Sequence, residues 1–99
     1  MSASDFEARA QSALDQLRAT LESDPELDVE EKGDGVFEIS FDDGSRIIIN
    51  RHSAAQEIWV AARSGGFHFR WDGSAWRNMR DGTELFSALA GLIAAQRGA

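Results

Sequence analysis

Hydrophobic residues recur at helical spacing near both ends of the chain. One stripe predicts a helix over residues 5–22, and a second predicts a helix over residues 84–97. We expect Ser4, paired with Glu7 in a capping box, to begin the first helix, and Thr83 to cap the second. The stripes consist of Phe6, Ala10, Ala13, Leu14, Leu17 and Leu21 in the first helix, and of Leu85, Phe86, Leu89, Leu92 and Ile93 in the second.

Between these helices, hydrophobic and polar positions alternate in short runs, which is typical of strands with one buried face. The predicted strands cover residues 27–31, 36–41, 46–50, 57–62, 67–71 and 75–79. We expect turns at 42–45, at Ser64–Gly66 and at Asp72-Gly73, and such short connections favour antiparallel pairing. Because two amphipathic helices must bury their stripes on one sheet face, we predict an α+β fold. It is a two-layer α-β sandwich: an antiparallel sheet of about six strands, with the N- and C-terminal helices packed on one face, forming a single domain over residues 1–99.

The alternation places one tryptophan on the solvent-facing side of the sheet. In the strand over 57–62, Ile58 and Val60 point toward the helices, so Trp59 points away from them. The same argument brings further side chains to this face, namely Asn50, His68 and Arg70. An exposed tryptophan beside arginine is a common interface anchor, although it can also serve only to pack under arginine stems. The only histidines are His52 and His68, and a histidine without a cysteine or a paired histidine is usually an ordinary surface residue.

Charge is distributed unevenly along the chain. Residues 1–45 hold 13 acidic and 3 basic side chains, giving −10, whereas residues 46–99 hold 4 acidic and 7 basic, giving +3. This charge disfavours nucleic-acid binding through the first half, because phosphates would be repelled, and it favours a cation or a basic protein surface as partner. The absence of cysteine excludes disulfides, thiolate zinc sites and an iron–sulfur cluster held by this chain. We see no signal peptide and no membrane-spanning run, and expect a cytoplasmic protein.

The strongest acidic run is "ESDPELDVEEKGDG", Glu22 to Gly35, which has seven carboxylates and one lysine. Four carboxylates alternate with other residues from Asp24 to Glu30, so an edge strand would point Asp28 and Glu30 outward together. Carboxylate oxygens bind hard cations. The spacing of these carboxylates does not match an EF-hand loop. No histidine falls within residues 22–35, which argues against a tight transition-metal cage there. The alternative is a solvated, charged edge that prevents strand-to-strand aggregation.

Four segments together resemble the frataxin family, and within it the bacterial branch known as the CyaY proteins. They are "DDGSRIIINRH", "QEIWVAARSGGFHF", "DGSAW" and "RDGTELFSAL", and the resemblance covers nearly the whole chain. It implies weak binding of ferrous or ferric iron on an acidic ridge formed by the first helix and first strand. It also implies docking on the cysteine desulfurase and the scaffold protein of iron–sulfur cluster assembly, by a protein that is a monomer at rest and can form metal-driven oligomers.

The resemblance also implies roles for particular residues. The metal-binding positions are Asp15, Glu22, Asp24, Glu26, Asp28, Glu30, Glu31, Asp42 and Asp43. The partner-binding positions are Glu22, Asp24, Asp28, Glu30, Asn50, Trp59, His68 and Arg70. The chain departs from the pattern in having Arg18 between Asp15 and Glu22, and Glu7 where related bacterial chains can carry histidine.

Two other functions are compatible with the residues alone. A small acidic chaperone of the secretion type would carry a protein client without metal and would dimerise through an apolar surface. An enzyme that oxidises ferrous iron would need a dedicated ligand set, such as the Glu-x-x-His pairs of di-iron bundles, and the chain has none. No nucleophile–base set is present either, so we expect no catalytic residues.

Overall fold

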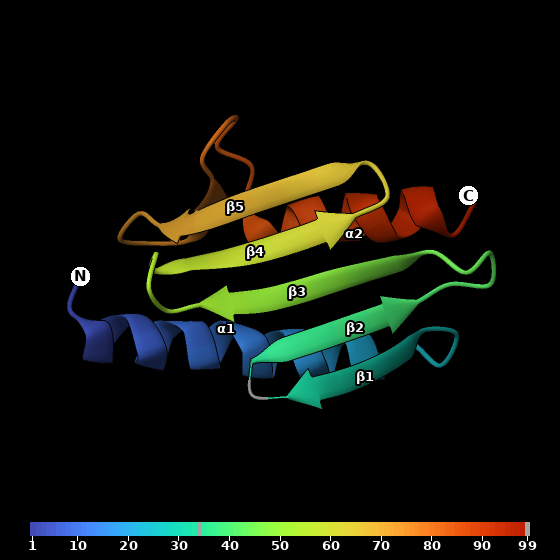
Figure 1. Cartoon of the computed structure of the whole chain (residues 1–99), viewed down its shortest axis with the longest axis horizontal. Helices are drawn as coiled ribbons and strands as arrows, with labels where there is room; N and C mark the ends of the chain where they lie inside the picture. The colour runs from blue at the N-terminus through green and yellow to red at the C-terminus, as the bar shows by residue number, and fades with distance from the viewer. Residues whose placement is uncertain (34, 99) are drawn as a thin grey trace.

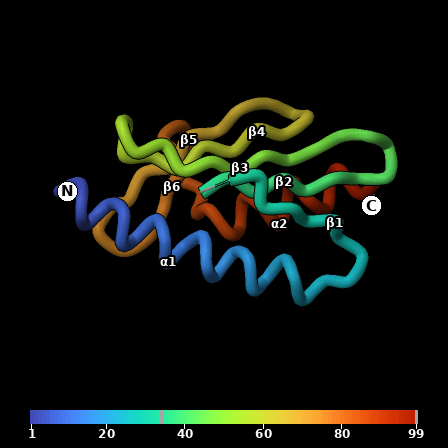
Figure 2. The backbone as a smooth tube through the Cα atoms, turned by 60° about the horizontal axis from the view of Figure 1, so that its bottom comes forward, coloured from blue at the N-terminus to red at the C-terminus, as the bar shows by residue number. Residues whose placement is uncertain are grey.

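The computed structural model describes residues 1–33 and 35–98, which form a helix, six strands and a second helix (Figure 1). The elements are α1 (Ala3–Glu22), β1 (Asp28–Gly33), β2 (Val36–Ser40), β3 (Arg46–His52), β4 (Glu57–Ala62), β5 (Gly65–Trp71), β6 (Trp76–Asn78) and α2 (Leu85–Gln96). The strands pair antiparallel in the order β1-β2-β3-β4-β5-β6. Both helices lie on one face of the sheet (Figure 2), which confirms the predicted two-layer α+β sandwich.

The core lies between the helices and the sheet. All six residues of the predicted α1 stripe are buried, and in α2 Leu85 and Leu89 are buried while Phe86, Leu92 and Ile93 pack half-buried beside them. The sheet side of the core is made of alternate strand residues, namely Phe37, Ile39, Ile47, Ile49, Ile58, Val60 and Phe69. Within the described residues, neither helix combines the length and hydrophobicity needed to cross a membrane.

Both predicted helix caps are wrong by one or two residues. The Oγ atom of Ser2, not Ser4, caps α1 by accepting from the backbone N–H of Asp5 at 3.1 Å. In α2 the cap is Glu84 rather than Thr83, and its carboxylate accepts from two backbone N–H groups of the first turn. A carboxylate also carries a negative charge to the positive end of the helix dipole, which a hydroxyl does not.

The predicted turn at Ser64–Gly66 is also misplaced. Gly65 and Gly66 belong to β5, where they pair with Ala62 and Ala61 of β4, so the reversal takes place at residues 63–64. Gly65 adopts a φ of +144°, which the missing side chain permits. The ladder between β4 and β5 therefore continues up to the turn, where Ala62 pairs with Gly65.

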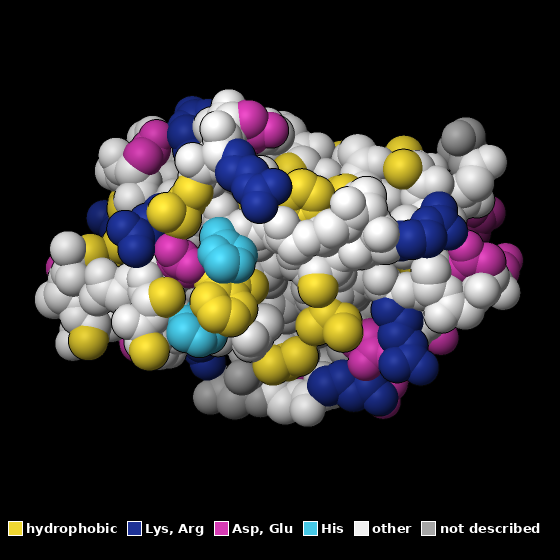
Figure 3. Space-filling model, turned by 45° about the horizontal axis from the view of Figure 1, so that its top comes forward, with side chains coloured by type: hydrophobic (Ala, Val, Ile, Leu, Met, Phe, Trp, Pro, Cys, Tyr) yellow, Lys and Arg dark blue, Asp and Glu magenta, His cyan; other side chains and the backbone are white. Residues whose placement is uncertain are grey.

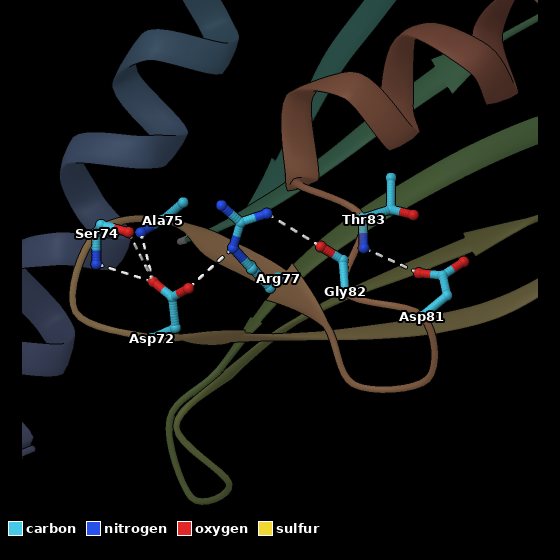
Figure 4. Close-up of polar contacts among 7 residues, drawn as sticks. All are labelled: Asp72, Ser74, Ala75, Arg77, Asp81, Gly82 and Thr83. Atoms are coloured by element: carbon cyan, nitrogen blue, oxygen red, sulfur yellow. Dashed lines mark hydrogen bonds and ion pairs between the residues drawn. The ribbon is translucent and has the colours of Figure 1, made fainter.

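A polar network fixes the turn between β5 and β6 and the loop that leads to α2 (Figure 4). The Asp72 carboxylate accepts from the backbone N–H groups of Ser74 and Ala75 at 2.8 and 2.9 Å. Arg77 donates both to Asp72, at 2.8 Å, and to the carbonyl of Gly82, at 3.1 Å. The two backbone donors and Arg77 hold the pKa of Asp72 well below its usual range.

Candidate functional site

The open face of the sheet carries the predicted tryptophan. Ile58 and Val60 are buried beneath the helices, whereas Trp59 lies half-buried on the opposite face, which confirms the expected strand register. Asn50 of β3 and His68 of β5 are its direct partners across the two neighbouring strands. The structure therefore brings together the side chains that the alternation assigned to this face.

Two imidazole rings cover the two faces of the Trp59 indole. The His52 ring is stacked with a centroid distance of 3.8 Å and an angle of 11°, and the His68 ring with 4.6 Å and 10°. In Figure 3 both histidines appear in cyan next to hydrophobic side chains on this face. His52 was expected to be an ordinary surface residue, and its stacking on Trp59 is a finding of the structure.

A buried carboxylate lies beside this stack. The Glu57 side chain is only 6% exposed. It accepts from Trp59 Nε1 at 2.6 Å and from Arg70 Nε at 3.0 Å, and His68 Nδ1 lies 3.4 Å away. Burial disfavours the charged form, but these donors outweigh it and hold the pKa of Glu57 below its ordinary value. We refer to His52, Glu57, Trp59, His68 and Arg70 as the open-face cluster.

Sequence reasoning missed Glu57 because alternation placed it, like Trp59, on the wet face of the sheet. Neighbouring side chains exclude water from that position, so a solvent-facing strand residue becomes buried. The available signal was its position two residues before the tryptophan on the same face, with His68 and Arg70 on the next strand.

The acidic residues occupy a different part of the molecule, which we refer to as the acidic surface. Its members lie in the C-terminal half of α1, in the segment from residue 24 through β1, and in the turn between β2 and β3. β1 is an edge strand, and its Asp28 and Glu30 are exposed while Leu27 and Val29 pack toward the core, as predicted. The nine predicted metal ligands, all exposed or half-buried, are Asp15, Glu22, Asp24, Glu26, Asp28, Glu30, Glu31, Asp42 and Asp43.

Basic residues neutralise part of this surface. Four of them form ion pairs with five of its carboxylates. The pairs are Arg97 with Asp24 and Glu26, Lys32 with Glu30, Arg18 with Glu31, and Arg63 with Asp43. The Asp15 carboxylate accepts from the side chain of Gln11. Within residues 1–33 and 35–98, the side chains of Glu22, Asp28 and Asp42 make no hydrogen bond or ion pair. Charge count alone therefore overstates the field of the acidic surface.

Arg97 marks the place where two carboxylates reach the same cation. Its Nη2 atom lies 2.7 Å from Asp24 Oδ2 and 3.7 Å from Glu26 Oε2. The backbone N–H of Glu26 and the Arg97 guanidinium hold the pKa of Asp24 below its ordinary value. In the described part of the chain, no three acidic or histidine side chains are grouped closely enough to hold a metal ion. A preformed cage is thus absent there, and the assignment of the nine residues as ligands stays a prediction.

Comparison with known proteins identifies the family. A model of the frataxin-like domain matches residues 1–99. The iron–sulfur cluster assembly protein CyaY of Dechloromonas aromatica is 54% identical over 99% of this chain and 94% of its own length. CyaY of Cupriavidus metallidurans is 47% identical, with 99% and 92% covered.

Solved structures give the same result for the fold. The frataxin of Psychromonas ingrahamii superposes with a TM-score of 0.88 at 23% identity, over 99% of this chain and 93% of its own. The trimeric frataxin of the yeast Saccharomyces cerevisiae, complexed with ferrous iron, gives 0.68 at 25% identity, with 95% and 86% covered. From the family model and the relatives together, the chain belongs to the frataxin-like family.

Proposed function

We propose that this protein acts in iron–sulfur cluster assembly in the cytoplasm, as a weak iron binder that docks on the cysteine desulfurase and the scaffold protein. The observation that carries the proposal is its identity of 54% and 47%, over nearly the whole chain, to two proteins named for iron–sulfur cluster assembly. The two surfaces described above give this role a physical basis. Delivery of iron and control of the assembly complex both require binding rather than catalysis.

Iron, as cargo, would bind to the acidic surface. Carboxylate oxygens coordinate ferrous and ferric ions, and exposed carboxylates bind these ions weakly because water competes for every coordination position. Asp24 and Glu26 already converge on a single cation, the guanidinium of Arg97. An iron ion that takes the place of Arg97 would meet two carboxylates and complete its coordination with water. The yeast frataxin complexed with ferrous iron supports this role by similarity.

Docking on the desulfurase would use the acidic surface as well. Its exposed carboxylates on β1 present negative charge along a sheet edge, which favours a basic partner and accelerates encounter. Docking on the scaffold would use the open-face cluster together with Asn50, because a tryptophan with neighbouring arginine is the usual composition of an interface anchor. The two partners would thus bind different regions of one small domain.

The test is a titration of the purified protein with purified cysteine desulfurase by calorimetry, at two salt concentrations and in chelator. We expect a monomer that binds, with affinity falling as salt rises because exposed charges are screened. Binding that is absent, or present without salt dependence, would contradict docking through the acidic surface. A dimer in chelator would favour the chaperone alternative instead.

A further inference from the structure

The Glu57 carboxylate contacts three other members of the open-face cluster. One oxygen accepts from Trp59 and faces His68, and the other accepts from Arg70. These contacts join two residues of β4 to two of β5. Trp59 and Arg70 both donate to a carboxylate that is only 6% exposed, so water competes little for the two hydrogen bonds that hold them.

The contacts also decide which atoms of the stack are available to a partner. Trp59 Nε1 is occupied by Glu57, and both faces of the indole are occupied by imidazoles. A partner therefore meets the edges of three stacked rings rather than an open indole face. Stacking of a partner cation or ring on Trp59 would require one histidine to move away first.

The polar neighbours of the two imidazoles point to opposite tautomers. His52 Nδ1 accepts from the backbone N–H of Ala55 at 3.3 Å, so its proton resides on Nε2. His68 Nδ1 lies 3.4 Å from a Glu57 carboxylate oxygen without forming a hydrogen bond, and the negative charge at that distance favours a proton, rather than a lone pair, on Nδ1. The Nε2 atom of His68 is then an acceptor, on a side chain that is 52% exposed.

We propose that Glu57 is the positioning residue of the docking surface: it holds Trp59 edge-on and sets His68 in the Nδ1–H form, so that Nε2 accepts a hydrogen bond from a donor on the partner. The proposal rests on the proposed docking through this face and adds the residue that organises it. Proteins orient metal-binding histidines in the same way, with a carboxylate beside one ring nitrogen that fixes the tautomer. Here the recipient is an N–H or O–H group of the partner protein.

The test compares Glu57→Met, which keeps the volume and removes both acceptors, with Glu38→Met. Glu38 is a matched control, because it lies on the same sheet face, is 13% exposed and pairs with Arg46 and Lys32, away from Trp59. Glu57→Gln is the conservative variant and leaves one acceptor oxygen for Trp59, Arg70 and His68 to share. If Glu57→Met does not fold, the same measurements are made on Glu57→Gln instead.

The first readout is nitrogen NMR of the imidazoles and of the Trp59 indole. We expect the parent and Glu38→Met to show His68 as Nδ1–H and His52 as Nε2–H, with the indole proton shifted by its carboxylate acceptor. Glu57→Met should lose the His68 preference and the indole shift, and Glu57→Gln should lose them in part. A parent with His68 as Nε2–H, or a Glu57→Met spectrum like that of the parent, would overturn the positioning role.

The second readout is the affinity for the purified scaffold protein. We expect about a tenfold loss for Glu57→Met and none for Glu38→Met, since an anchor that is no longer preorganised must be ordered on binding. Unchanged affinity in a variant that has lost the His68 tautomer would refute the role in docking. A parent that does not bind the scaffold would contradict the proposed function, while the NMR readout would still decide the role of Glu57.

Discussion

The acidic surface and the open-face cluster differ in how their charges are held. On the acidic surface, exposed side chains form ion pairs one or two at a time, such as Glu30 with Lys32. In the open-face cluster, one buried carboxylate serves Trp59, Arg70 and His68 together. Exposed pairs contribute about 0 to 1 kcal/mol and rearrange readily, whereas a buried charge must keep its partners. Under the proposed function, the first region would therefore exchange its cations for iron or for a basic partner, and the second would present one fixed shape.

The largest expected effect is on docking through the acidic surface. We expect Asp28→Lys combined with Glu30→Lys to weaken desulfurase binding by about a hundredfold, because it places positive charge where a basic partner approaches. Isothermal titration calorimetry measures the affinity, and circular dichroism checks the fold. Asp5→Lys with Asp81→Lys changes net charge by the same amount away from β1 and should leave most of the affinity. Equal losses from both double variants would mean that net charge, and not this surface, controls docking.

A smaller effect is expected on stability at the open face. Trp59→Ala should lower the free energy of unfolding by about 2 kcal/mol, since it removes two ring contacts and one donor to Glu57. Trp76 is buried beside Phe6 and Trp71, so Trp76→Ala should lower it by about 4 kcal/mol. Urea unfolding followed by circular dichroism measures both. Equal losses at the two positions would show that the open-face cluster is as firmly packed as the core.

A hard cation such as Mn²⁺ should stabilise the folded protein through the acidic surface. At a tenfold excess over its Kd, Mn²⁺ should stabilise the parent by about 1.4 kcal/mol, because it binds the folded state alone. Converting Glu22, Asp24, Asp28 and Glu30 to amides should remove most of this gain. A melting series with and without Mn²⁺ measures it, and a full gain in the amide variant would exclude these carboxylates as ligands.

The position of Arg97 makes that test sharper. Arg97→Ala should enlarge the response to Mn²⁺, since it frees the carboxylates of Asp24 and Glu26 from their shared cation. Arg9→Ala removes the same charge from a side chain that stacks on Trp71, and serves as the control. If both arginine variants respond alike, iron does not compete with Arg97.

The smallest expected effect is on the pH dependence of stability. The pKa of Glu57 in the folded protein lies below its ordinary value of 4.5. Its carboxylate therefore contributes stability above that value, and the contribution is lost as pH falls through the lower pKa of the folded state. Glu57→Gln should flatten the decline in unfolding free energy below pH 4.5 relative to the parent. A decline as steep as that of the parent, measured by urea unfolding across the acid range, would assign the acid sensitivity to other carboxylates.

The sequence predicted most of the fold because burial follows periodicity directly. The spacing of Phe6, Leu14 and Leu21 identified the buried face of α1, and the alternation around Trp59 identified the open face. The helix caps were misplaced because several oxygens near each helix start can accept the same N–H groups, and local geometry selects among them. The spacing of residues along the chain does not show which of these oxygens caps the helix.

The candidate site was less predictable because its organisation depends on residues far apart in the chain. Arg97 lies 73 residues from Asp24, and their ion pair requires the end of α2 to meet the segment between α1 and β1. Burial of Glu57 likewise depends on the rings of a neighbouring strand. Composition predicted where charge is concentrated, whereas pairing and burial follow only from the tertiary structure.

Mapping the two partners onto the protein tests the central claim most directly, namely that separate regions bind separate partners. The measurement is a set of amide and indole NMR spectra of the labelled protein, recorded with the desulfurase and with the scaffold protein in turn. We predict that the desulfurase perturbs the C-terminal half of α1 and β1, and that the scaffold perturbs β4, β5 and the Trp59 indole. Perturbation of the same residues by both partners, or of neither region by either partner, would contradict the account.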